Sequence, residues 1–153
     1  MPGDFLVCET MNFTGLTPDL LRSVTRIVTH ADCPDGIASA MILHDALPGA
    51  AVEFIAYNSP KHRDLAATEG MLFCDIVPPR ERVGEFVDVG AIVRDHHKGA
   101  QDIVAAFGER GVFADEVEDP GVSGALLAHR DWMMLTDQLR RSDTERRIAL
   151  TVA

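Results

Sequence analysis

Cysteine, aromatic residues and long apolar runs are all scarce in this sequence of 153 residues. The three cysteines (Cys8, Cys33 and Cys74) lie far apart, which excludes a disulfide framework and the paired spacing of a zinc finger. No stretch approaches the roughly 20 apolar residues of a membrane-spanning helix. The first ten residues also lack the basic start and apolar run of a secretory signal. We therefore expect a reduced, cytoplasmic protein that makes no membrane contact.

Basic residues are also scarce, because 14 lysines and arginines stand against 24 acidic residues, for a net charge of −10. Acidic residues outnumber basic ones in both halves, 10 to 4 in residues 1–76 and 14 to 10 in residues 77–153. This balance excludes duplex nucleic acid as a partner, because duplex binding depends on basic groups that displace counterions. It is compatible with a small anionic substrate, since a bound cation can reverse the sign of a local site.

Short apolar segments alternate with helical patterns along the chain. Runs rich in β-branched and apolar residues predict strands, and apolar residues at helical spacing predict helices. The predicted strands cover residues 24–30, 51–57, 71–75, 91–94 and 111–114, and the predicted helices cover 37–47, 101–107 and 121 or 123 to about 139. This alternation predicts an α/β fold with a parallel sheet of about five strands and helices on both faces. We expect one domain over residues 1–153, with a locally basic tail from residue 140.

Acidic residues and histidines follow three of the predicted strands. They are His30, Asp32 and Asp35 after the first, Asp75 after the third, and Asp95, His96 and His97 after the fourth. Since ligands of open α/β sheets bind at the carboxyl ends of the strands, we expect these side chains to converge on one crevice. Carboxylates mixed with imidazoles suit Mn²⁺, Fe²⁺, Co²⁺ or Zn²⁺ better than Ca²⁺.

Three segments with this placement resemble motifs of one enzyme superfamily. Residues 30–40 (HADCPDGIASA), 73–75 (FCD) and 95–98 (DHHK) resemble motifs one, two and three of the DHH phosphoesterases. That superfamily includes family II inorganic pyrophosphatases, exopolyphosphatases, exonucleases and cyclic-dinucleotide phosphodiesterases. Residues 122–128 (VSGALLA) resemble a helix opening that follows motif three in some members. The resemblance covers roughly residues 24–135.

The resemblance implies a site for two divalent ions, with Mn²⁺ expected. Asp75 matches the aspartate that bridges both ions, and His96 matches a histidine that ligates one of them. His30 and Asp35 match the ligands of motif one, and Asp32 is a further candidate. A fourth aspartate completes the second site in the family. Its candidates here are Asp131, Asp137 and Asp143, and position along the chain favours Asp137.

The implied reaction is hydrolysis of a phosphodiester or phosphoanhydride, in which paired metal ions activate water and neutralise the phosphoryl oxygens. His97 matches a histidine that points toward the substrate phosphate. Asp95 would fix a histidine tautomer, the usual role of a carboxylate behind a ligand. Arg94 and Lys98 flank the histidine pair and could supply positive charge, as could residues 61–63 (KHR).

Two departures from the family pattern shape the expected partners. Ile37 stands where pyrophosphatases carry a second aspartate, and the usual C-terminal substrate-binding domain, with its glycine-rich basic motif, is not found in these 153 residues. We therefore expect a small phosphorylated substrate or a short single-stranded oligonucleotide, with a homo-oligomer or a separate subunit completing the cleft. The alternative is a metal- and phosphate-binding module without turnover.

Several of these residues also have ordinary structural interpretations. Arg94 and Lys98 are as well explained as solvated surface charges. Cys33 and Cys74 suggest a zinc site with the histidine pair, but no CxxC spacing supports it, and Cys74 fits a small buried hydrophobe. His62 has no evident partner in the sequence and stays unassigned.

Overall fold

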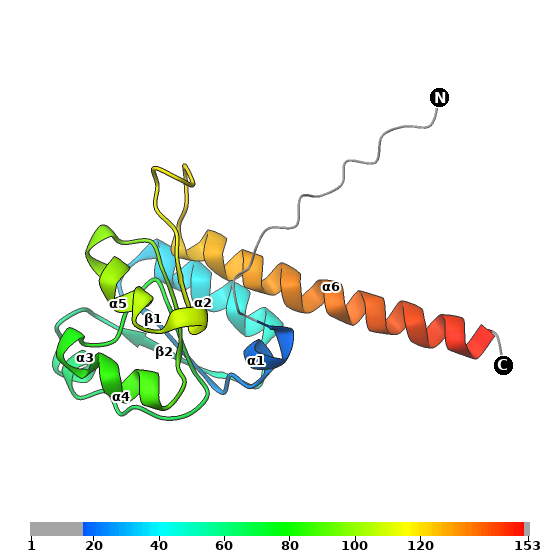
Figure 1. Ribbon diagram of the computed structural model, residues 1–153, viewed down its shortest axis with the longest axis horizontal. Coiled ribbons are helices and arrows are strands. Elements are labelled where there is room, and N and C mark those ends of the chain that lie inside the picture. Colours follow the sequence, from blue (N-terminus) through cyan, green and yellow to red (C-terminus); the bar gives the residue numbers. More distant parts are fainter. Residues whose placement is uncertain (1–16, 152–153) are drawn as a thin grey trace.

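The sheet has five parallel strands in the order β2-β1-β3-β4-β5 (Figure 1). The strands are Arg26–His30 (β1), Ala51–Ile55 (β2), Met71–Cys74 (β3), Ile92–Asp95 (β4) and Gly111–Phe113 (β5). The structure is a computed structural model that describes residues 17–151, with side chains described as far as residue 137. Every neighbouring pair of strands is parallel, which confirms the predicted α/β class and sheet.

Helices occupy most of the connections between the strands. They are α1 (Pro18–Arg22), α2 (Pro34–Ala46), α3 (Pro60–Arg63), α4 (Val83–Asp88), α5 (Gln101–Ala105) and α6 (Gly124–Thr151), with 3₁₀ turns at Arg80–Arg82, Lys98–Ala100 and Gly108–Arg110. Local sequence fixes the start of α2, because Cys33 is extended, Pro34 opens the first turn and Asp35 brings negative charge to the helix N-terminus.

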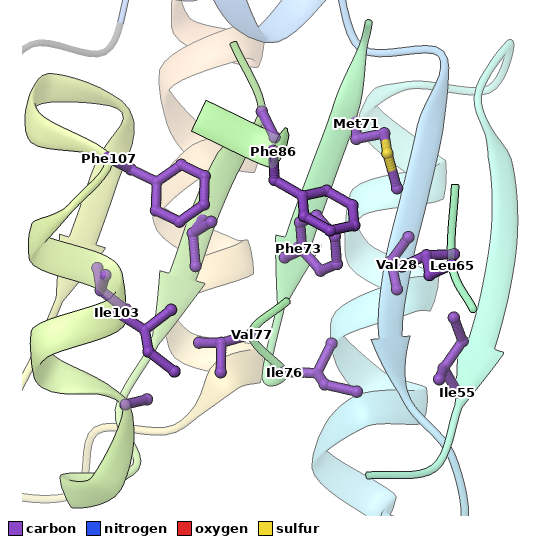
Figure 2. Close-up of a cluster of buried hydrophobic side chains, with 14 residues drawn as sticks. Val28, Ile55, Leu65, Met71, Phe73, Ile76, Val77, Phe86, Ile103 and Phe107 are labelled. Carbon is purple, nitrogen blue, oxygen red and sulfur yellow. The ribbon is translucent and has the colours of Figure 1, made fainter. Parts of the chain in front are cut away.

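One face of the sheet packs against α4 and α5. Val28 of β1 and Phe73 of β3 lie in a buried cluster with Phe86 of α4 and with Ile103 and Phe107 near α5 (Figure 2). The rings of Phe73 and Phe86 meet edge to face, 5.4 Å between centroids. The side chains of this cluster are among the most deeply buried in the described chain, so this layer holds the carboxyl ends of β1 and β3 in fixed positions.

The opposite face packs against α2 and α6. Ile27 and Leu72, each one residue before Val28 and Phe73, belong to a second buried cluster with Leu43 of α2 and Ala128 of α6. Successive strand residues point to opposite faces, so the near-continuous apolar character of these strands matches a sheet that is covered on both sides. This confirms the prediction of helices on both faces.

The strand order reverses between β1 and β3. The chain leaves β1 through α2 to reach β2 at one edge of the sheet, and then returns to β3 on the other side of β1. From β3 it continues through α4 and α5 toward β5 at the opposite edge. Parallel α/β sheets bind ligands at the carboxyl ends of the strands at such a reversal. Here that position lies between the ends of β1 and β3.

The last described element, α6, runs beside α2 and continues beyond the sheet (Figure 1). It has 28 residues, which corresponds to about 42 Å at 1.5 Å per residue. The Trp132 indole of α6 donates a hydrogen bond to Asp45 of α2, 2.7 Å long. Among the described residues, no helix combines the length and the apolar character needed to cross a bilayer.

Candidate metal centre

Residues in a left-handed backbone conformation follow three neighbouring strands. Asp32 after β1, Asn58 after β2 and Asp75 after β3 have φ of 57°, 56° and 63°. Aspartate and asparagine tolerate this conformation better than other residues with side chains, but it still carries backbone strain. Such residues gather where a fold holds side chains in place for function. All three lie at the carboxyl edge of the sheet, where the sequence predicts the site.

Asp75 lies at the centre of this edge. A nitrogen of His30, the sulfur of Cys33 and a carboxylate oxygen of Asp75 lie within 4.8 Å of one another. Single ligand atoms of Asp75, His96 and His97 form a second group within the same distance. We call these groups the first and the second ligand group. Asp75 belongs to both of them, and its side chain is only 1% exposed.

The Asp75 carboxylate is buried and incompletely satisfied. Its Oδ1 lies 3.1 Å from Nε2 of His96, whereas its Oδ2 has no hydrogen-bond partner among the described residues. Burial, reinforced by the negative charge of Asp35, raises the pKa of Asp75 above its ordinary value. A buried carboxylate without full compensation is costly, and a bound cation would remove that cost.

Close packing of α6 holds Asp75 in this environment. A Cβ on Gly124, the first residue of α6, would lie 2.5 Å from the Cβ of Asp75. Only glycine allows that approach, because any side chain would overlap the aspartate. A Cβ on Gly36 would likewise overlap the carbonyl oxygen of His30. Two glycines therefore let the first turns of α2 and α6 approach the ends of β1 and β3.

Asp35 connects the starts of α2 and α6. Its Oδ2 accepts the backbone N–H of Gly124 at 2.8 Å, and its Oδ1 accepts that of Ala125 at 2.7 Å. Partial burial alone would raise the pKa of Asp35, but these two backbone donors and nearby groups lower it below its ordinary value. Asp35 Oδ2 also lies 3.2 Å from His96 Nε2, so this ring nitrogen lies between two carboxylates. Asp35 is thus beside the second ligand group, although it belongs to neither.

Asp95 holds the two histidines that follow it. Its Oδ1 accepts the backbone N–H groups of His96 at 2.6 Å and His97 at 2.8 Å, and also lies 2.6 Å from His97 Nδ1. This hydrogen bond to buried Asp95 raises the pKa of His97 above its ordinary value. It also leaves Nε2 as the ring atom directed toward Asp75, 4.0 Å away. The geometry is the one expected for a carboxylate that fixes a histidine tautomer.

Tyr57 is a residue of the site that sequence reasoning did not single out. Its ring meets those of His30, His62 and His97 edge to face, with centroids 5.1, 5.5 and 6.4 Å away. Its hydroxyl lies 3.4 Å from Oδ2 of Asp95, and burial raises its pKa, so it stays protonated. Tyr57 comes two residues after β2, and its place beside three histidine rings depends on strand order, which the sequence does not reveal.

Cys33 is a second unexpected member of the site. In the sequence it suggested only a zinc site with Cys74 and the histidine pair, which no CxxC spacing supported, yet its sulfur lies in the first ligand group with His30 and Asp75. Position alone could have indicated Cys33, because it lies three residues after a strand-end histidine, but a single cysteine carries little signal.

His62, which the sequence left unassigned, proves to be a buried structural residue, since its Nε2 lies 2.9 Å from the carbonyl oxygen of Val77.

The expectation that Arg94 supplies positive charge to a substrate is wrong. Its side chain is 2% exposed and forms two hydrogen bonds of 2.8 and 2.9 Å with Asp131 of α6. Arg94 precedes Asp95 in β4, so strand alternation turns it toward the face that α6 covers. The same pair corrects the candidacy of Asp131 as a metal ligand, because both of its oxygens accept hydrogen bonds from Arg94.

The structure does not bring Asp137, the favoured fourth ligand, to either ligand group. It is an exposed residue of α6, 13 residues beyond Gly124 and hence about 20 Å along the helix from the point where α6 meets Asp75. The side chain of Asp143 lies outside those that the structure describes. Asp32 is exposed and belongs to neither ligand group, so the structure does not bring it to the predicted ligands.

The remaining cationic candidates lie away from the two ligand groups or in solvent. Lys98 is exposed in the 3₁₀ turn after His97. Lys61 pairs with Glu53 at 3.1 Å, and Arg63 donates to the carbonyl oxygen of Asn58. Residues 61–63, in α3, are therefore engaged with β2 and with the segment that follows it.

The donor set fits divalent metal ions. The first ligand group offers one imidazole, one thiol and one carboxylate, and the second offers two imidazoles and the same carboxylate. Two buried atoms of these groups, Oδ2 of Asp75 and Nδ1 of His30, lack hydrogen-bond partners within the described chain. Buried polar atoms are seldom left unpaired, so a ligand at these atoms is the natural completion of the site.

Comparison with known proteins adds no relative. No protein-family model matches the chain, and searches of curated proteins and of solved structures return no similar protein. Conclusions about chemistry therefore depend on the geometry of the site itself.

Proposed function

We propose that this chain is a phosphoesterase domain that depends on two divalent ions and hydrolyses a phosphodiester or phosphoanhydride bond in a small substrate. The observation that carries the proposal is Asp75, a fully buried carboxylate that belongs to two ligand groups at once and has one oxygen without a partner among the described residues. A carboxylate shared in this way is suited to bridge a pair of ions. The three motifs that resemble DHH phosphoesterases contribute the residues of both groups.

Each side chain of the proposed site has a distinct task. His30 would hold one ion and His96 the other, with Asp75 between them. When bound, the two ions would supply an activated water and neutralise charge on the phosphoryl oxygens. Mn²⁺ is the first ion to test, because the resemblance implies it and carboxylate ligands suit it.

His97 is the residue of the pair that remains available to a substrate. Its side chain is 43% exposed, and the hydrogen bond to Asp95 raises its pKa. A histidine whose pKa is raised in this way can donate a hydrogen bond from Nε2 to a phosphoryl oxygen or protonate a leaving group. The acidic surface favours short substrates such as dinucleotides and short single-stranded oligonucleotides over long polymers, which need an extended basic path.

The test is turnover by the purified protein with added Mn²⁺ on pyrophosphate, short RNA and a cyclic dinucleotide. We expect phosphate or nucleotide release from at least one substrate, and its loss to the buffer level in Asp75→Asn and His96→Ala. His97→Gln should slow the reaction by about 10²–10⁴-fold, the usual contribution of a positioned acid or base. Asp88→Asn is the matched control and should retain activity, since Asp88 is exposed at the end of α4 and lies outside both ligand groups.

A second candidate function is metal binding without turnover. The burial of Arg94 favours it, because the arginine beside the histidine pair is paired with Asp131 and is not available to a phosphate. Protein that binds two ions but releases no product from any substrate of the panel would support this candidate and contradict hydrolysis.

A further inference from the structure

The thiol of Cys33 has no structural task that would explain its position. Cys33 occupies the N-cap position of α2, where serine, threonine, aspartate or asparagine usually caps the helix. Its side chain makes no capping hydrogen bond. Within the described part of the chain it forms no disulfide, and it is half-buried, unlike Cys74, which lies fully inside the core. The thiol is therefore free to interact with whatever occupies the site beside it.

The two neighbours of this thiol each carry one buried atom that lacks a hydrogen-bond partner among the described residues. The Cys33 sulfur lies within 4.8 Å of a ligand atom of His30 and of Asp75. Asp75 is 1% exposed with Oδ2 unpartnered, and Nδ1 of His30 is a buried atom that also lacks a partner among the described residues. Three different donor types thus face one another, and two of them carry an unsatisfied buried atom.

From this arrangement we infer that Cys33 is a metal ligand, and that its sulfur makes the first ligand group selective for Zn²⁺ or Co²⁺ over Mn²⁺. The inference rests on the proposed function, since it takes the first ligand group as an ion site. Thiolates favour borderline-soft ions, whereas Mn²⁺ is best held by oxygen ligands. The second ligand group contains no sulfur, so the two subsites would differ in the ions they prefer.

Coordination by Cys33 is a simple exchange. The S–H bond breaks, a bond from sulfur to the ion forms, and the proton passes to the buffer. The start of α2 favours the resulting negative charge, because unpaired backbone N–H groups give a helix N-terminus partial positive charge.

Absorption spectroscopy of the full chain titrated with Co²⁺ tests the inference. A thiolate bound to Co²⁺ gives an intense charge-transfer band in the near ultraviolet, which imidazole and carboxylate ligands do not give. We expect this band in the unaltered protein and in Cys74→Ala, the matched control that removes the other described thiol. Cys33→Ser should lose the band but still bind Co²⁺ at the second ligand group.

Affinities measured in the same titrations give a second criterion. Loss of a group that only orients a ligand costs about 10–100-fold in metal affinity, so loss of the sulfur itself should weaken Co²⁺ and Zn²⁺ binding at one subsite by at least as much. Mn²⁺ affinity should change less. Should Cys33→Ser fail to fold, alkylation of Cys33 in the unaltered protein is the alternative measurement, and Co²⁺ should protect Cys33 from the reagent.

The outcomes separate this inference from the proposed function. Two bound Co²⁺ ions without a thiolate band, and with Cys33 alkylated equally fast with and without Co²⁺, would overturn the role of Cys33 and leave the two-ion phosphoesterase standing. Failure to bind Co²⁺, Zn²⁺ or Mn²⁺ at all would overturn both.

Discussion

Asp75 and Asp95 are both fully buried carboxylates at the ends of adjacent strands, yet their surroundings differ. Asp95 accepts hydrogen bonds from the backbone of His96 and His97, and the His97 ring and the Tyr57 hydroxyl lie beside its two oxygens. Asp75 keeps one oxygen without a partner in the part of the chain that the structure describes. The first arrangement positions other residues, and the second is suited to hold a cation. Asp95 thus positions its neighbours, whereas Asp75 is suited to bind an ion.

The Asp95→Asn variant tests the supporting role. Asparagine has the same shape, but it lacks the negative charge that raises the pKa of His97 through their hydrogen bond. We expect the His97 pKa, measured by NMR titration of the metal-free protein, to fall in this variant. Because the folded-state pKa is raised, the proton on His97 stabilises the native state below the ordinary pKa of about 6.5. That contribution is lost as the pH rises through the folded-state value.

The stability of the variant should therefore lose this part of its pH dependence. In the metal-free protein Asp32→Asn is the charge control, since it removes an exposed charge from the same edge of the sheet. An unchanged His97 pKa in Asp95→Asn would show that Asp95 does not set the protonation of the ring.

At the residue scale, the sequence predicted those side chains that a strand carries directly to its own carboxyl end. His30, Asp75 and His96 belong to this class, and the structure brings them together. The expectation for Arg94 failed because Arg94 lies one position before Asp95 in β4. Side chains alternate along a strand, so Arg94 points to the face of the sheet that α6 covers. Cys33 was not predicted as a ligand, since its proximity to Asp75 depends on how the end of β3 lies beside the end of β1.

The start of α6 is the element on which the site most depends. Gly124 lies against Asp75, and the backbone N–H of Ala125 donates a hydrogen bond to Asp35 at the start of α2. Two helix N-termini and one strand end thus meet around shared carboxylates. Asp35 accordingly has a structural role whether or not it also contacts an ion.

Gly124→Ala tests this junction. The new Cβ would overlap Asp75, so either α6 or the aspartate must move. We expect a loss of about 1–3 kcal/mol in the free energy of unfolding, as for other overpacked sites, together with weaker metal binding. Denaturant unfolding and metal titration measure the two effects.

The matched control is Gly84→Ala in α4. A Cβ there would meet nothing within 4 Å, so this change should be neutral or stabilising, because alanine favours helices over glycine. Equal stability and metal affinity of the two alanine variants would contradict the role assigned to Gly124.

Elements with a strong pattern were predictable, and the shortest helices were not. The β-branched run that contains β1 and the apolar run of β3 were identified within about two residues of their observed ends, the usual scatter of element boundaries. The helices α1, α3 and α4 were missed, because they have 5, 4 and 6 residues and show too little periodicity. The end of α6 lies beyond the predicted residue 139, since no glycine or proline stops the pattern there.

At the scale of the whole molecule, strand order turns a set of separate motifs into one site. The order β2-β1-β3-β4-β5 places the ends of β1, β3 and β4 side by side, although α2, β2 and α3 separate β1 from β3 in the chain. The sequence predicted a parallel sheet, but it did not specify this order. The place of Tyr57 beside the histidines follows from it.

Part of the net charge of −10 lies at the candidate metal centre. Asp35, Asp75 and Asp95 meet at the carboxyl edge of the sheet, while the buried arginine nearest to them is neutralised by Asp131. Such an edge repels phosphate by itself. Two divalent ions would reverse the sign of its charge and make it attractive to phosphate, so the proposed function depends on metal binding.

The most direct test is a crystal structure of the protein grown with Co²⁺, which both ligand groups suit, with anomalous scattering recorded at the cobalt edge. We expect two peaks about 3.5–4 Å apart, the separation typical of two-metal sites. Asp75 should lie between them, with His30 at one ion and His96 at the other. A map with no peak at Asp75, or with cobalt bound only elsewhere on the acidic surface, would contradict the two-ion site.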